Sequence, residues 1–236
     1  MRDSVRHFVA EFVGIFALVF VGGAAIMSSA IANVPSSLLN VALAHGIILA
    51  VMVSATMRIS GHLNPAVTIG FLVARRIEPV MAGVYIVAQL LGAMLAAYVL
   101  KALFPAAVVE ATRLGGQSLA LDVSMSKGIM YEAIATFFLV FVVFGTAVDP
   151  KAPKIGGLAI GLTITADILA IGPRTGGSMN PARSFGPAVA NGFFEAQAVY
   201  WIGPILGGMV AALLYDSLFL RRDIEPVDHG AVRPLT

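Results

Sequence analysis

Long apolar runs alternate with short polar connections along the whole chain. Six of these runs approach the roughly 20 apolar residues that a helix needs to cross a bilayer. They cover about residues 7–28, 38–57, 80–102, 128–148, 156–172 and 197–219. The pattern predicts an all-α integral membrane protein with six transmembrane helices.

Two further apolar stretches are too short to cross a bilayer. They cover about residues 65–73 and 181–190, and each begins with proline directly after an asparagine. Proline suits the first position of a helix, because no hydrogen bond is required of its nitrogen there. Short apolar segments in matching places of two halves are typical of broken helices beside a binding or conduction path. We therefore expect two re-entrant half-helices.

The two halves of the chain repeat. The segment GHLNPAVTIG at 61–70 matches GSMNPARSFG at 177–186, and AEFVGIFALVF at 10–20 matches YEAIATFFLVF at 131–141. Each half holds three spans, so the second half enters the membrane in the opposite orientation, as an inverted 3+3 repeat. We expect one transmembrane channel domain over 1–236, with repeat one at about 7–102, repeat two at about 128–219 and a cytoplasmic tail at 220–236.

Composition excludes a soluble globule. Hydrophobic residues make up 58% of the 236 residues and charged residues only 12%, with a mean hydropathy of +0.91. A soluble domain carries about 25% charged residues. The net charge of +2 is too small to indicate nucleic-acid binding, and the absence of cysteine excludes disulfides, thiolate metal sites and cysteine nucleophiles. We interpret the N-terminus as the start of a spanning helix, not as a removed signal peptide.

Basic residues indicate the orientation. With the N-terminus inside, ten of the fifteen Lys and Arg residues fall on the cytoplasmic side. Cytoplasmic loops of membrane proteins carry the excess of such residues. Both termini are therefore predicted to be cytoplasmic.

Two Asn-Pro-Ala triplets carry the candidate chemistry. Inverted symmetry would bring the two half-helix N-termini together near the midplane, each with about +0.5 of a charge. A water passing there could accept from both asparagine amides, and it could then no longer accept from a neighbouring water. The proton wire would break, and the positive helix ends would repel cations. The alternative is two coincidental helix caps. The triplets are Asn64, Pro65, Ala66 and Asn180, Pro181, Ala182.

Over about residues 8–220 the chain resembles the major intrinsic protein (aquaporin) family. The motifs are Glu11, SGHLNPAVT, Glu132 with Thr136, and GGSMNPARSFGPA. Within the family, ALAHG, DILAIGP and YWIGPILGG look most like the tonoplast aquaporins of plant vacuolar membranes. The resemblance implies the aquaporin fold, the water-selective mechanism above, a homotetramer with one pore per subunit and no cofactor or metal. It favours a cell (inner) membrane, or a vacuolar membrane if the source is a plant.

Arg183 directly follows the second triplet, and an intramembrane arginine is costly and usually functional. The resemblance places it in a selectivity filter with His45, Ile168 and Gly177. This set is similar to that of tonoplast channels that pass water and ammonia. Those relatives also place a loop histidine at the filter, whereas residues 104–126 contain none, which counts against ammonia. A structural salt bridge for Arg183 and a buried core position for His45 are the alternatives.

The remaining motifs separate water from glycerol channels. Ser184, Ala188 and the pair Tyr200-Trp201 resemble the water group. We expect a passive channel for water, with ammonia or other small uncharged solutes as further candidates, that excludes protons and ions. A glycerol-type facilitator and a secondary transporter are the alternatives. An enzyme is not expected, since the sequence offers no nucleophile–base set.

Three buried acids need an explanation. The resemblance implies that Glu11 and Glu132 accept hydrogen bonds from the backbone of the two asparagine loops, and buried N–H groups must be paired somewhere. Asp167 is either a paired acid at the end of the fifth span or a charge near the pore mouth or a subunit contact. His62 is expected to be structural. His7 and His229 are assigned to the termini and carry no functional signal.

Overall fold

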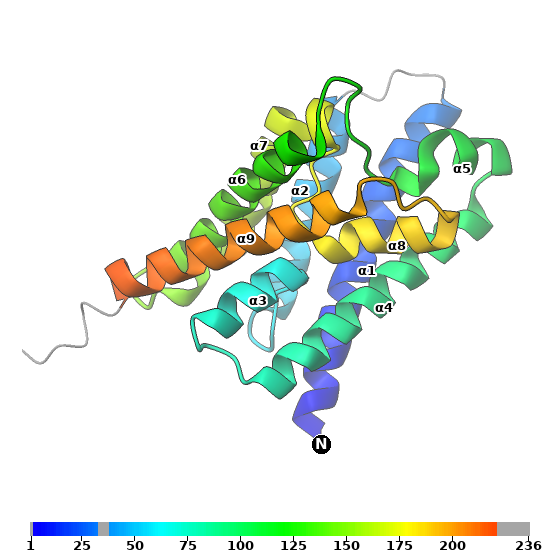
Figure 1. The fold of residues 1–236 in the computed structure, drawn as a ribbon. Coiled ribbons are helices and arrows are strands. Elements are labelled where there is room, and N and C mark those ends of the chain that lie inside the picture. The colour runs from blue at the N-terminus through cyan, green and yellow to red at the C-terminus, as the bar shows by residue number, and fades with distance from the viewer. Residues whose placement is uncertain (1, 33–37, 221–236) are drawn as a thin grey trace, which may run out of the picture.

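The computed structural model describes residues 2–32 and 38–220 as a tilted bundle of long helices with short helices between them (Figure 1). Within these residues, six helices are long and apolar enough to cross a membrane, which confirms the expected number. They are α1 (Arg2–Ile31), α2 (Leu38–Thr56), α4 (Pro79–Leu103), α6 (Met125–Val143), α7 (Gly156–Thr175) and α9 (Gln197–Tyr215). Single π-turns at 144–148 and 216–220 extend α6 and α9. The tail expected over 220–236 lies, apart from Leu220, outside the described residues.

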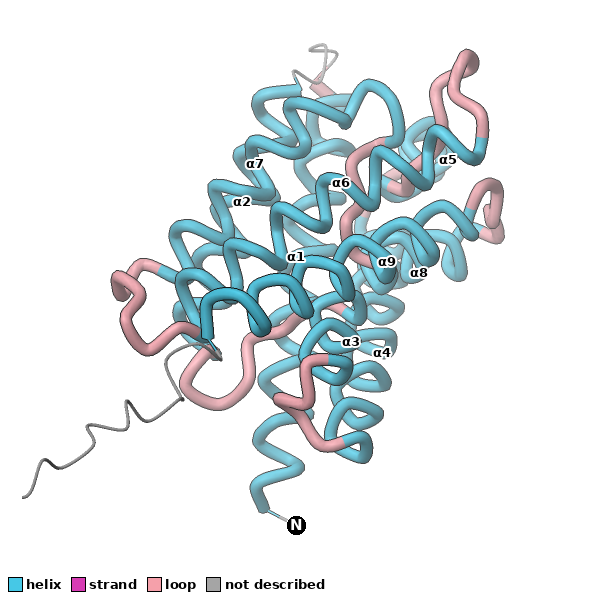
Figure 2. The backbone as a smooth tube through the Cα atoms, turned by 60° about the vertical axis from the view of Figure 1, so that its left-hand side comes forward, coloured by secondary structure: helices cyan, strands magenta, loops and turns pink. Residues whose placement is uncertain are grey.

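Three shorter helices complete the described fold. The two expected half-helices are α3 (Pro65–Val73) and α8 (Pro181–Asn191). The third, α5 (Ala106–Thr112), continues into a 3₁₀ turn at 113–115 and was not expected from the sequence. Figure 2 shows no strand in the described part of the chain.

Helix packing repeats between the two halves of the chain. Helix α1 packs on α4 as α6 packs on α9, and α3 packs on α9 as α8 packs on α4. Each half-helix therefore lies against the last span of the other half. Glycines allow the close crossings: a Cβ at Gly92 would lie 2.5 Å from the Phe12 carbonyl oxygen, and one at Gly207 would lie 2.0 Å from that of Ala133. This packing places the two half-helices end to end in the middle of the bundle.

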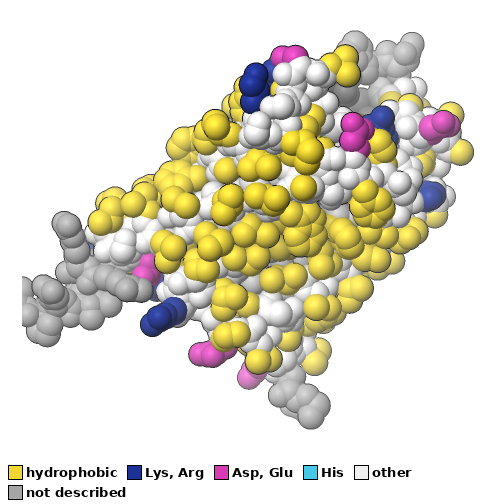
Figure 3. Space-filling model, in the orientation of Figure 1, with side chains coloured by type: hydrophobic (Ala, Val, Ile, Leu, Met, Phe, Trp, Pro, Cys, Tyr) yellow, Lys and Arg dark blue, Asp and Glu magenta, His cyan; other side chains and the backbone are white. Residues whose placement is uncertain are grey.

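The surface is apolar across its middle. Figure 3 shows a broad band of hydrophobic side chains, with the charged side chains of this face near the two ends of the molecule. Exposed hydrophobic side chains occur on several spans, among them Val13 on α1, Leu95 on α4 and Val210 on α9. Apolar side chains turned outwards suit a helix bundle whose solvent is lipid. The chain is an integral, multi-pass membrane protein.

Candidate functional site

Both half-helices begin at a capping asparagine. Asn64 and Asn180 have extended backbone conformations, and proline occupies the next position in each helix. The Asn64 side-chain oxygen accepts from the Ala66 N–H at 2.8 Å, and that of Asn180 accepts from the Ala182 N–H at 3.1 Å. These bonds satisfy donors that the first helical turn cannot pair. Because both side-chain oxygens are turned to their own helices, the amide nitrogens point away from them.

The amide nitrogens join the two halves. Asn64 Nδ2 donates to the Met179 carbonyl at 2.8 Å, and Asn180 Nδ2 donates to the Leu63 carbonyl at 2.9 Å. An asparagine amide has two hydrogens, so one on each side chain is left for another acceptor. Both asparagines are buried, yet both line the same internal cavity. The remaining donors can therefore serve a solute inside that cavity.

Leu63 and Met179 have left-handed backbone conformations, with φ of 50° and 53°. Such conformations are uncommon for residues with a side chain, and they persist where the surroundings impose them. Glu11 and Glu132 supply the constraint. Glu11 Oε2 accepts from the Leu63 N–H and Glu132 Oε2 accepts from the Met179 N–H, both at 2.6 Å. The strained residue then presents its carbonyl to the asparagine of the opposite half.

Each buried carboxylate pairs further groups of its loop. Glu11 accepts from the N–H groups of Gly61 and His62, at 2.9 and 2.8 Å. Glu132 accepts from the Ser178 N–H at 2.9 Å and from the Thr175 hydroxyl at 2.6 Å. Both carboxylates are fully buried. Glu11 and Glu132 thus lie against the loops that carry the two asparagines and pair their backbone N–H groups.

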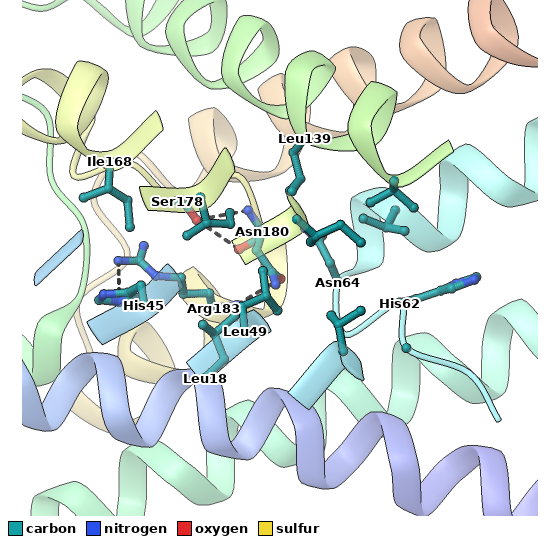
Figure 4. Close-up of a pocket in the computed structure, with 16 residues that line it drawn as sticks. Leu18, His45, Leu49, His62, Asn64, Leu139, Ile168, Ser178, Asn180 and Arg183 are labelled. Atoms are coloured by element: carbon teal, nitrogen blue, oxygen red, sulfur yellow. Dashed lines mark hydrogen bonds between the residues drawn. The ribbon is translucent and has the colours of Figure 1, made fainter. Parts of the chain in front are cut away.

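A narrow cavity of about 20 Å³ runs past the two asparagines. Figure 4 shows Asn64 and Asn180 between His45, Ile168 and Arg183 on one side and His62 on the other. The wall between these polar ends is mostly apolar. Its apolar residues are Leu18, Leu49, Val53, Val67, Leu139, Val143, Ile160, Ile164 and Ile168. Such a path offers a water molecule few hydrogen bonds except at the asparagines and at its ends.

The side chains of His45 and Arg183 meet at one end of the cavity. Arg183 Nη2 lies 3.0 Å from His45 Nε2, and His45 Nδ1 lies 2.7 Å from the Val41 carbonyl oxygen. Since a carbonyl only accepts, Nδ1 carries the ring proton, and Nε2 accepts from Arg183. Arg183 Nε and Nη1 are buried and have no partner among the described residues. The guanidinium therefore keeps donors for a solute, while the imidazole has used both of its nitrogens.

The Arg183 end opens into a wider vestibule of about 370 Å³. Arg183 and Ile168 line both spaces, so they stand at the junction. Gly177 does not line the narrow cavity, but a Cβ there would lie 3.3 Å from Ile168 Cγ1. Its φ of 57° also disfavours any side chain. His45, Ile168 and Arg183 thus lie at one end of the narrow cavity, and Gly177 lies next to Ile168.

A family model described as major intrinsic protein matches residues 1–215, about nine-tenths of the chain. The chain belongs to the major intrinsic protein family. This membership confirms the resemblance drawn from the motifs, and it accounts for the six spans and the two half-helices.

Curated relatives of this major intrinsic protein align over most of its length. A probable aquaporin TIP3-2 of Arabidopsis thaliana is 41% identical, over 99% of this chain and 91% of its own. Aquaporin TIP2-1 of Zea mays is 42% identical, over 95% and 91%. Among solved structures, the X-ray structure of the aquaglyceroporin from Plasmodium falciparum superposes with a TM-score of 0.83 at 26% identity, over 93% of this chain and 98% of the other.

Some contributors to the site were missed in the sequence. Gly22 leaves room for the His45 ring, because a Cβ there would lie 2.2 Å from His45 Nε2. Gln89 donates to Glu11 Oε2 at 2.6 Å and to Thr68 Oγ1 at 3.1 Å. A lone glutamine in an apolar span is a signal that could have been used, since intramembrane polar groups usually have a role. Gly22 gave no such signal, because glycine is common throughout these helices.

Two further residues differ from the expectations. His7 lies in the first turns of α1 and is hydrogen-bonded to the Tyr85 hydroxyl, a contact that the sequence did not suggest. Asp167 is buried in α7, and one of its carboxylate oxygens has no partner in the described part of the protein. Asp167 lines none of the cavities described above. Within the described residues, no cluster of three His, Asp or Glu side chains could hold a metal ion.

Proposed function

We propose that this major intrinsic protein is a passive channel for water. The observation that carries the proposal is the reciprocal bonding of Asn64 and Asn180 at the midpoint of a narrow, mostly apolar path. A water molecule there can accept one hydrogen bond from each amide. Its own hydrogens then point away from the asparagines, and it cannot accept from the next water. Water passes, and a continuous proton wire does not form.

Electrostatics support the exclusion of cations. The N-termini of α3 and α8 bring two partial positive charges to the middle of the path. Arg183 adds a full positive charge at one end. A cation would lose its hydration shell in a cavity of this size without finding acceptor groups along the apolar wall. An uncharged solute avoids that cost.

The proposed filter residues are His45, Ile168, Gly177 and Arg183. Arg183 offers the donors, Ile168 supplies an apolar wall, and Gly177 adds no side chain. His45 holds the guanidinium in place and has no nitrogen left for the solute. Ser184, which resembles the water group, has its Oγ hydrogen-bonded to Ser178 Oγ. The relatives named above are aquaporins, and their names favour water over glycerol.

The remaining proposals follow from family membership and from the charge pattern. We propose an inverted 3+3 repeat, a homotetramer with one pore per subunit, both termini in the cytoplasm, and no enzymatic activity. The similarity to TIP-type plant aquaporins favours a vacuolar membrane if the source is a plant.

Stopped-flow light scattering on proteoliposomes tests the proposal. After an osmotic step, vesicles with the protein should shrink much faster than empty vesicles, with a low activation energy. An Arg183→Ala variant should shift the balance towards larger solutes, measured as glycerol uptake relative to water flux. Folded, inserted protein that shrinks vesicles no faster than bare lipid would refute the water-channel assignment. Glycerol uptake as fast as water flux would instead favour the facilitator.

A further inference from the structure

The far end of each half-helix is bonded to the span beside it. Helix α8 lies along α4, and α3 lies along α9 (Figure 1). Lys101 Nζ donates to the Ala190 carbonyl oxygen at 2.6 Å, and Arg76 Nε donates to Asp216 Oδ1 at 2.6 Å. Both bonds lie at the helix ends opposite the two capping asparagines. We call these two contacts the far-end anchors.

The first far-end anchor joins α8 to α4. Lys101 belongs to the last turn of α4. Its acceptor, the Ala190 carbonyl, is one of the last four carbonyls of α8, which have no N–H partner further along their own helix. A lysine ammonium suits this place, because the C-terminus of a helix carries a partial negative charge. Lys101 thus caps α8 from a neighbouring span.

The second far-end anchor joins α3 to α9. The Arg76 N–H donates to the Phe71 carbonyl in the last turn of α3 at 2.8 Å, so this residue moves with that helix. Its side chain reaches Asp216, the residue that follows α9. The Asp216 side chain is only 4% exposed. A buried carboxylate is costly unless it is paired, so this contact resists opening.

The two anchors occupy matching places in the repeat. Gly92 on α4 and Gly207 on α9 make the corresponding close crossings described above. Adding 115 to the residue number takes Gly92 to Gly207, and it also takes Lys101 to Asp216. One half therefore places a cation where the other half places an acid, and the half-helix opposite supplies the complementary group. A contact made twice, with donor and acceptor exchanged, indicates a requirement of both halves.

The half-helices are too short to hold their positions alone. Helix α3 has nine residues and α8 has eleven, whereas isolated helices shorter than about 12–15 residues are marginal in water. Each begins at an asparagine whose amide reaches the opposite loop at 2.8 or 2.9 Å. A helix that shifts along its axis carries its first residue with it. An anchor at the far end therefore sets where that amide lies in the pore.

We propose that Lys101 and the pair of Arg76 and Asp216 are positioning residues of this channel. They fix α8 and α3 along their axes, and so they place the amides of Asn180 and Asn64. None of the three side chains lines the narrow cavity, so they act through the half-helices. The inference rests on the proposed function, because its readout is water flux.

The test is the osmotic water permeability of proteoliposomes per folded, inserted protein, together with its activation energy. Lys101→Met keeps an unbranched side chain and removes the ammonium, so permeability should fall severalfold and the activation energy should rise. Lys101→Arg restores a donor and should recover most of the native flux. Lys127→Met, at an exposed position near the start of α6, is the matched control and should behave as the native protein.

Arg76→Gln tests the second anchor independently. It keeps a polar side chain but removes the charge that pairs Asp216, and it should lower permeability in the same way. Arg75→Gln, at the exposed arginine beside it, is the control and should keep native values. A merely structural role would reduce the amount of folded protein, but it would leave the flux per folded molecule and the activation energy unchanged.

The possible outcomes separate this inference from the proposed function. Rapid flux in the native protein, with native permeability and activation energy in both Lys101→Met and Arg76→Gln, would overturn the inference and leave the water channel standing. A loss in Lys101→Met that Lys101→Arg does not recover would also overturn it, because the hydrogen bond would not be what matters. Folded native protein without water flux would overturn both. If Lys101→Met does not fold, Arg76→Gln and its control decide the question.

Discussion

Asn64 and Asn180 each donate a side-chain hydrogen to the carbonyl of the residue that precedes the other. The bonds run from Asn64 to Met179 and from Asn180 to Leu63, at 2.8 and 2.9 Å. Each amide is thus held by its own helix through oxygen and by the opposite loop through nitrogen. The orientation of both donors towards the pore is therefore a property of the pair.

Asn180→Ala should weaken both the fold and the channel. The change removes the cap of α8 and leaves the buried Leu63 carbonyl without its donor. Each such loss costs about 1–3 kcal/mol. We expect a lower thermal unfolding temperature in detergent and a large loss of water permeability in vesicles. Asn191→Ala, at the far end of the same helix, is the control and should change neither. Native values of both quantities in Asn180→Ala would contradict the structural account.

Gly22→Ala should disturb the filter without introducing a polar change. A Cβ at this position would lie 2.2 Å from His45 Nε2, the atom that accepts from Arg183. The histidine must move, so we expect lower water permeability even though alanine is the better helix former by about 1 kcal/mol. Gly83→Ala is a matched control, because a Cβ there meets nothing within 4 Å. Equal water flux in the two variants would show that His45 does not need its present place.

Glu132→Gln should destabilise the second asparagine loop. The carboxylate accepts from Ser178, Met179 and Thr175, and a glutamine nitrogen cannot accept. At least one buried donor is left without a partner, at a cost of about 1–3 kcal/mol. Unfolding temperature and water flux should both fall, whereas the exposed Glu195→Gln should leave both unchanged. An unaltered Glu132→Gln protein would argue that the loop holds its own conformation.

The ion pair of Asp122, in the loop before α6, should make thermal stability depend slightly on pH. Hydrogen bonding from Arg174 holds the pKa of the Asp122 carboxyl below its usual value, and the two groups lie 2.6 Å apart. A carboxyl whose pKa is lowered by folding stabilises the fold above its unfolded pKa, near 3.9, and this contribution is lost as pH falls through the folded pKa. Asp122→Asn should therefore unfold at a slightly lower temperature than the native protein near neutral pH.

The same comparison in acid provides the control for Asp122. Below the folded pKa both proteins are neutral at this position, so their unfolding temperatures should converge. Because Asp122 is exposed, salt should also narrow the difference at neutral pH. A difference that persists in strong acid would mean that the substitution acts through something other than the ion pair.

Local patterns were sufficient for the architecture. Apolar runs of bilayer length placed all six spans, because only helices of that length satisfy their backbone within lipid. Asn-Pro at the head of two shorter runs marked the start of α3 and α8, since proline and a capping side chain both favour a helix beginning there. The short α5 escaped notice because seven residues carry too little periodicity to stand out.

Contacts between residues far apart in the sequence depended on the tertiary structure. Only the folded bundle brings the Met179 carbonyl to the amide of Asn64 and His45 Nε2 to Arg183. Only there does the missing side chain of Gly22 leave room for the His45 ring. His7 had no visible partner in the sequence, and it gains one because α1 and α4 lie side by side and bring it to Tyr85. Hydropathy and helix capping act over one or two turns, whereas the shape of a pore is set by which side chains meet across helices.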